Sequence, residues 1–102
     1  MRINWKKLVK EIPASVKVGP RIHYEVLWTN QFENPDLMGE MRPDNRQIVI
    51  KSGLSPKETV TTFFHEWLHA VSDENEAALT EQQVSQLEKR FVDFQTFFNL
   101  FK

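Results

Sequence analysis

Cysteine is absent from this chain of 102 residues, which excludes both a disulfide scaffold and a metal site built on thiolates. Long apolar runs are also lacking, since none approaches the roughly 20 residues that a membrane-spanning helix needs. Positive and negative charges are interspersed, and a formal net charge of −1 gives no general attraction to nucleic acid or anionic lipid. Because cysteine and a signal-peptide pattern are both missing, we expect a cytoplasmic protein. Because the charge is balanced and long apolar runs are lacking, we expect that it binds neither nucleic acid nor membrane.

The length of the chain leaves room for one domain and not for two. Eight phenylalanines and three tryptophans provide the bulky apolar side chains for a hydrophobic core. No internal repeat or low-complexity segment interrupts the sequence. We therefore expect a single domain that spans residues 1–102, and the sequence leaves its oligomeric state open.

The first half of the chain has the pattern of a short helix followed by strands. Apolar residues at helical spacing predict a helix over residues 4–12, which ends before Pro13. Residues that favour strands dominate 22–28. Segments 37–42 and 46–51 flank a run with the composition of a turn, which predicts a hairpin. These segments predict a sheet of three or four strands.

The second half is helical. Ser55 as N-cap and Glu58 closing a capping box predict the start of a helix that runs to about Ser72. Thr80 and Gln83 form a second capping box. The apolar stripe that follows it consists of Val84, Leu87, Phe91, Phe94 and Phe98. The order helix, strands, helix, helix predicts an α+β fold.

The run His65-Glu66-Trp67-Leu68-His69 has the form H-E-x-x-H and lies inside the second predicted helix. Residues four positions apart share one side of a helix, so both imidazoles can reach the same metal ion. Neutral imidazole suits zinc, and a catalytic zinc site has a third protein ligand and an open position for water. Zinc lowers the pKa of that water, and a neighbouring carboxylate can accept its proton. The motif therefore predicts His65 and His69 as ligands of Zn2+ and Glu66 as the catalytic base.

The same helix has two faces of different character. At about 100° per residue, one side gathers an apolar stripe of Val60, Phe64, Trp67 and Val71. The two histidines point almost the opposite way, flanked by the polar residues Thr61, Thr62 and Ser72. A helix that serves only packing needs the first stripe alone. The second face therefore favours a metal site over the alternative of two incidental surface histidines.

The motif and its surroundings resemble the zincin metallopeptidases, in particular minimal gluzincin-like domains of the phage- and prophage-encoded type. Residues 38–41 followed by 47–50 resemble the strand pair before the active-site helix of that family. Residues 65–74 followed by 79–81 resemble the active-site helix and the start of the next helix. The resemblance implies a zincin-like fold: an N-terminal helix, a small three- or four-stranded sheet, the active-site helix and a C-terminal helix. It also implies that an edge strand can bind an extended peptide by strand addition.

The resemblance further implies a third metal ligand, usually a glutamate, from the helix after the motif. The acids considered for this role are Glu74, Glu76, Glu81 and Glu88. If the two helices form an antiparallel hairpin, residues 81–88 lie level with the histidines. Glu81 also lies in the segment that the resemblance favours. We therefore predict Glu81 as the third ligand, with Glu76 and Glu88 as alternatives.

Together these residues predict a small zinc-dependent metallopeptidase that hydrolyses a peptide or protein substrate, with Glu66 activating a zinc-bound water. No group that would stabilise an oxyanion is evident; His23 and Tyr24 are candidates, although such residues are more often ordinary strand positions. The alternative is a metal-stabilised phage or prophage interaction or regulatory module without turnover, in which zinc ties two helices together. The intact Glu66 favours hydrolysis, because a purely structural metal site needs no base.

Overall fold

The computed structural model describes residues 4–19, 21–74 and 80–83. Its elements are α1 (Trp5–Glu11), β1 (Ser15–Gly19), β2 (Ile22–Thr29), β3 (Gly39–Arg42), β4 (Gln47–Lys51) and α2 (Pro56–Glu74). Residues 81–83 are also helical. The fold is therefore α+β, as expected, whereas the apolar stripe predicted after Gln83 lies outside the described residues.

The strands form one mixed sheet in the order β1-β2-β4-β3. The predicted hairpin is confirmed: β3 pairs antiparallel with β4, with Gly39 opposite Ile50 and Arg42 opposite Gln47. The Arg46 N–H donates to the Pro43 carbonyl at 3.2 Å and closes the turn between them. β2 pairs antiparallel with β1 and parallel with β4. This topology makes β3 an edge strand that runs antiparallel to its single neighbour.

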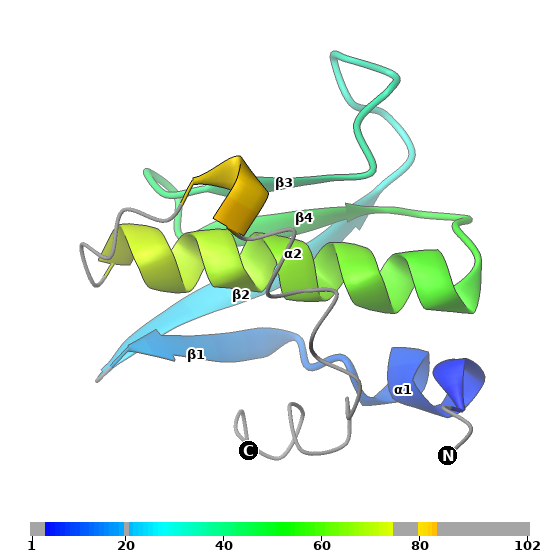
Figure 1. Ribbon diagram of the computed structural model, residues 1–102, viewed down its shortest axis with the longest axis horizontal. Coiled ribbons are helices and arrows are strands. Elements are labelled where there is room, and N and C mark those ends of the chain that lie inside the picture. The colour runs from blue at the N-terminus through cyan, green and yellow to red at the C-terminus, as the bar shows by residue number, and fades with distance from the viewer. Residues whose placement is uncertain (1–3, 20, 75–79, 84–102) are drawn as a thin grey trace.

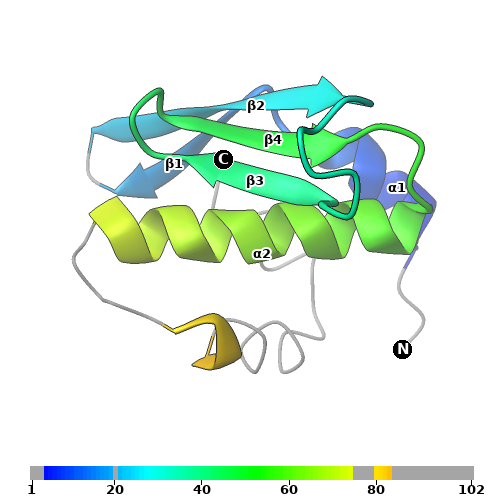
Figure 2. The ribbon, with the colours of Figure 1, turned by 90° about the horizontal axis from the view of Figure 1, so that it is seen from above.

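Helix α2 packs along one face of the sheet, and α1 lies near the N-terminal end of α2 (Figures 1 and 2). The core cluster consists of Leu8, Val16, Val18, Tyr24, Val26, Ile48, Ile50, Val60, Phe63, Phe64, Leu68 and Ala70. In the predicted stripe, Val60 and Phe64 are fully buried, and Trp67 and Val71 are partly buried against this cluster. The buried arc of α2 is wider than one stripe, because α1 as well as the sheet packs against the helix.

The helix starts follow the predicted capping residues. The Ser55 N–H donates to Glu58 Oε1 at 3.4 Å and the Glu58 N–H donates to Ser55 Oγ at 3.2 Å. The reciprocal bonds between Thr80 and Gln83 measure 2.9 and 3.1 Å. Both capping boxes are therefore confirmed, and they satisfy backbone donors that a helix start leaves without partners. None of the described helices is long and apolar enough to cross a membrane.

Helix α2 extends two residues beyond the expected end at Ser72. A carboxylate at a helix C-terminus is disfavoured by the helix dipole. Here the Tyr24 hydroxyl donates to Glu74 Oε1 at 2.7 Å, and Arg46 Nε lies 3.8 Å from the same oxygen. These contacts come from β2 and from the β3–β4 turn, and they stabilise the last described turn of α2. Both partners are far from Glu74 in sequence, so local sequence patterns do not reveal the contacts.

Candidate metal centre

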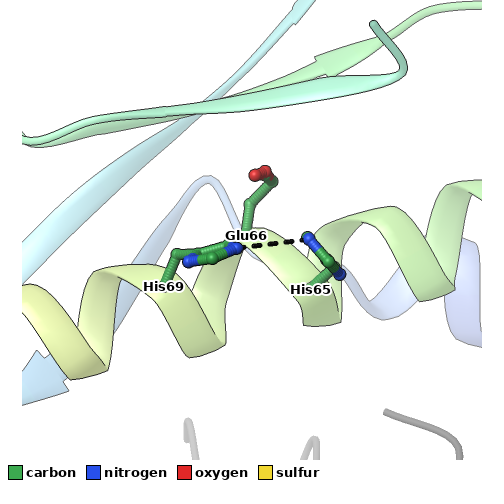
Figure 3. A group of neighbouring side chains, drawn as sticks. All are labelled: His65, Glu66 and His69. Atoms are coloured by element: carbon green, nitrogen blue, oxygen red, sulfur yellow. Dashed lines mark hydrogen bonds between the residues drawn. The ribbon is translucent and has the colours of Figure 1, made fainter. Parts of the chain in front are cut away.

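The two histidines of the motif lie side by side along α2. Their Nε2 atoms are 3.2 Å apart, and their rings meet edge to face with centroids 4.9 Å apart (Figure 3). The helical spacing of four residues produces this arrangement directly. Both side chains are only partly buried, so they are held in place yet remain accessible from solvent.

Glu81 reaches the same point from the segment after α2. Its Oε1 lies 2.7 Å from His65 Nε2, and its Oε2 lies 2.6 Å from His69 Nε2. Glu81 is the first residue after the cap Thr80, whose box with Gln83 fixes the start of that helical turn. The structure thus brings together the three residues that the sequence predicted as metal ligands.

The other acids considered as third ligand have different positions. Glu74 is bonded to Tyr24 and lies close to Arg46, at the end of α2. Glu76 and Glu88 lie outside the described residues. Among the acids that the structure describes, Glu81 is therefore the one that contacts both imidazoles.

The electrostatics of Glu81 follow from these two contacts. Partial burial by itself would raise the pKa of its carboxyl, but the hydrogen bond with His65 and the positive charges that His69 and His65 can carry outweigh it and hold the pKa below its ordinary value. When the two Nε2 atoms carry protons, each can donate one to a carboxylate oxygen. A bound metal would take the place of those protons, because imidazole binds metals through a deprotonated nitrogen.

The donor set fits a zinc ion. Tetrahedral zinc holds nitrogen ligands at about 2.0–2.1 Å, which separates two of them by about 3.3 Å. The observed separation of 3.2 Å between the Nε2 atoms of His65 and His69 is close to that value, whereas the Glu81 oxygens stand at hydrogen-bond distance from them, 2.7 and 2.6 Å. Two imidazoles and one carboxylate, with no thiolate, are a ligand set typical of catalytic zinc and leave a fourth position for water.

Glu66 lies beside this group on the side of the sheet. Possible ligand atoms of His65, Glu66 and His69 all lie within 4.8 Å of one another. In Figure 3 the Glu66 side chain points from α2 toward the sheet, beside the two imidazoles. The residue is only 8 % exposed. Its carboxylate is therefore held close to the centre without taking the place that Glu81 occupies.

A glycine in the edge strand makes room for Glu66. A Cβ built at Gly39 would lie 3.2 Å from Glu66 Cγ and 2.5 Å from Thr62 Cγ2. Only a residue without a side chain lets the start of β3 approach α2 this closely. The position of the predicted base therefore depends on a contact between β3 and α2.

An open cleft of about 380 Å³ adjoins the centre. Its lining residues are Leu37, Met38, Gly39, Glu58, Thr61, Thr62, His65, Glu66 and Glu81. Neither oxyanion candidate lines it: Tyr24 is buried in the core, and His23 is exposed on β2. In the sequence, Met38 and Gly39 stood out only as part of a predicted strand, and neither they nor Leu37 had an individual role in the site. The one local signal was a glycine within a predicted strand, which often marks close approach of another element.

Comparisons with known protein families, with curated proteins and with solved structures find no match to this chain.

Proposed function

We propose that this protein is a small zinc-dependent metallopeptidase of the zincin type, in which His65, His69 and Glu81 hold the metal and Glu66 is the base. The observation that supports it most is the convergence of Glu81 on both imidazoles at 2.7 and 2.6 Å from a separate segment of the chain. A carboxylate and two imidazoles facing one point beside an open cleft match the requirements of a catalytic zinc centre.

Each residue has a defined task in this proposal. A zinc ion, when bound, would lower the pKa of a water ligand and polarise the substrate carbonyl. Glu66 accepts the proton of the attacking water and delivers it to the departing amine. Its small exposed fraction, 8 %, restricts the carboxylate to the side of the cleft next to β3. His65 and His69 would coordinate the zinc ion, and the negative charge of Glu81 would offset part of the charge of the ion.

The edge strand provides a way to hold a peptide. β3 pairs with β4 on one side, and its first residue, Gly39, lines the cleft next to Glu66. An extended peptide can add to such an edge through backbone hydrogen bonds, with its side chains alternating between the cleft and solvent. A peptide bond presented in this way would lie beside the proposed base.

Metal analysis and hydrolysis assays on matched variants test the proposal. We expect about one zinc per chain in the wild type and in Glu66→Gln, as a single tetrahedral site requires. The zinc should be lost in His65→Ala and weakened in Glu81→Ala. Glu25→Ala, which removes an exposed carboxylate from β2, is the control for the loss of charge. Peptide hydrolysis should disappear in Glu66→Gln although zinc is retained.

Two outcomes would contradict the proposal. Failure of the wild type to take up zinc, even after refolding with the metal, would remove the centre. Unfolding on chelation, followed by circular dichroism, would instead favour a structural zinc in an interaction module. A fold that survives chelation, together with hydrolysis that returns when zinc is restored, is the result we expect.

A further inference from the structure

The cleft beside the centre combines exposed apolar side chains with negative charge. Leu37 and Met38 are 37 % and 47 % exposed, and both belong to the lining. Glu58 lies in the same lining and has no role as a ligand or base in the proposed function. The described lining residues include neither lysine nor arginine.

Among the lining residues that the structure describes, no cation balances the charge of Glu58. A zinc dication would be offset by the carboxylates of Glu81 and Glu66, which leaves Glu58 as the excess negative charge. Its capping interaction engages Oε1 with the Ser55 N–H at 3.4 Å, a neutral donor. Lys57, the adjacent cation, has its Nζ 6.0 Å from the centre of the Trp5 ring, toward α1. The cleft therefore presents an anionic group to whatever occupies it.

Glu58 stands at a defined distance from the metal ligands. It precedes His65 by seven residues, which are two turns of α2, so both lie on the same side of the helix. The separation along the axis is about 10.5 Å at 1.5 Å per residue. An extended peptide covers that distance in about three residues. A side chain three positions from the scissile bond thus comes level with Glu58.

The direction of the edge strand decides which side of the scissile bond this is. The chain enters β3 from Leu37 and Met38, passes Glu66 at Gly39 and continues away from the cleft to Arg42. A peptide paired antiparallel to β3 runs the other way. Residues on the C-terminal side of its scissile bond would then enter the cleft.

We propose that the cleft selects peptides with a lysine or arginine about three positions C-terminal to the scissile bond, bound by Glu58. An apolar residue between the scissile bond and this basic residue would lie against Leu37 and Met38. The proposal depends on the peptidase function proposed above. Glu58 acts here as a specificity-determining residue. An accessible ion pair of this kind is expected to favour the basic peptide by roughly two- to fivefold.

Binding and cleavage of three matched peptides, with lysine, glutamine or glutamate at that position, test it. Binding is measured by calorimetry on Glu66→Gln, with and without zinc, so that no turnover intervenes; cleavage is measured on protein with Glu66 intact. Each readout is repeated after Glu58→Gln and Glu58→Lys. Glutamine also closes a capping box, so Glu58→Gln removes the charge and keeps the helix start. Glu25→Gln removes an equal charge from exposed β2 and serves as the control.

The lysine peptide should bind two- to fivefold more tightly than the glutamine peptide. This preference should vanish with Glu58→Gln, reverse with Glu58→Lys and persist with Glu25→Gln. Equal binding of all three peptides, no binding of any of them, or a preference that survives Glu58→Gln would overturn the assignment. A Glu58-dependent preference without any cleavage would refute the peptidase and leave the cleft assignment intact. Cleavage without a charge preference would support the peptidase function and refute the assignment of Glu58.

Discussion

Gly39 and Thr62 are so close that a Cβ on Gly39 would lie 2.5 Å from Thr62 Cγ2, well inside van der Waals contact. Gly39→Ala should therefore push β3 away from α2 and lower the free energy of unfolding by about 1–3 kcal/mol. It should also reduce hydrolysis, because the same Cβ approaches Glu66 Cγ at 3.2 Å. Urea denaturation and a peptide assay measure the two effects.

A second substitution tests whether that contact is the cause. Thr62→Ser removes the methyl group that a Cβ at position 39 would meet, so the double variant should regain much of the stability lost in Gly39→Ala. Gly53→Ala is the contrasting case, since Gly53 has φ +84° and no atom within 4 Å of a built Cβ. It should cost about 1–2 kcal/mol through the backbone alone and leave the cleft unchanged. Strictly additive losses in the double variant would refute the steric explanation.

Trp67 links α2 to the sheet, because its Nε1–H donates to the Lys17 carbonyl on β1 at 2.9 Å. Trp67→Phe keeps an aromatic ring but removes the donor, and should lower the free energy of unfolding by about 1–2 kcal/mol. Zinc content should not change, since the substitution leaves both histidines in place. The control is Trp28→Phe, at a tryptophan 47 % exposed on β2, which should cost less than about 0.5 kcal/mol. Equal losses from the two would show that the hydrogen bond is not responsible.

Tyr24 should make stability fall at alkaline pH. Burial, followed by the hydrogen bond to Glu74 and the nearby charges of Glu74 and Asp73, raises the pKa of its phenol above the ordinary value, although Arg46 opposes this. A raised pKa means that the stabilising contribution is complete below the unfolded value of about 10 and is lost as pH rises toward the folded value. Unfolding temperatures between about pH 8 and 11 should fall more steeply in the wild type than in Tyr24→Phe.

The same titration can be followed directly, since Tyr24 is the one tyrosine of the chain. Tyrosinate absorbance should appear in the native protein only at higher pH than in the unfolded protein. Coincident titration curves for the two states would contradict the predicted shift. Glu74→Gln removes the charge that contributes to it, and should move the native curve toward the unfolded one.

Zinc should stabilise the folded protein through Glu81. A ligand that binds only the native state adds about 2.7 kcal/mol at a concentration one hundred times its Kd. Glu81→Gln keeps the size of the side chain but removes the anionic ligand, so at least about tenfold more zinc should be needed for the same rise in unfolding temperature. Thermal unfolding over a zinc series measures this, with Glu25→Gln as control. An unchanged zinc dependence in Glu81→Gln would exclude Glu81 as a ligand.

Local signals in the sequence were sufficient for the elements that depend on neighbours along the chain. The capping boxes at Ser55 and Thr80 predicted where helical segments begin, and the turn-forming run before Arg46 predicted the hairpin. Each depends on bonds between residues a few positions apart. The four-residue spacing of His65 and His69 likewise brings the imidazoles together through helix geometry alone.

Strand β1 and the parallel pairing of β2 with β4 had no comparable signal. Val16 and Val18 are too few to define a strand by alternation, and β1 is fixed instead by its pairing with β2. Glu74, in the last described turn of α2, is held by Tyr24, fifty residues earlier. Such contacts join segments whose separation in sequence carries no periodic pattern.

The sequence by itself therefore determined the helix that carries the site, the two histidines on one of its faces and the glutamate between them. For the third ligand the sequence predicted Glu81 but left alternatives, and only the tertiary structure brings Glu81 to both imidazoles. The tertiary structure also decided that Gly39 lets β3 approach Glu66 and that Leu37, Met38 and Glu58 share a cleft. The physical reason is the separation in sequence of the residues that interact. Helical spacing and capping are set by backbone geometry over a few residues, whereas the site is completed by segments that meet only when α2 packs against the sheet.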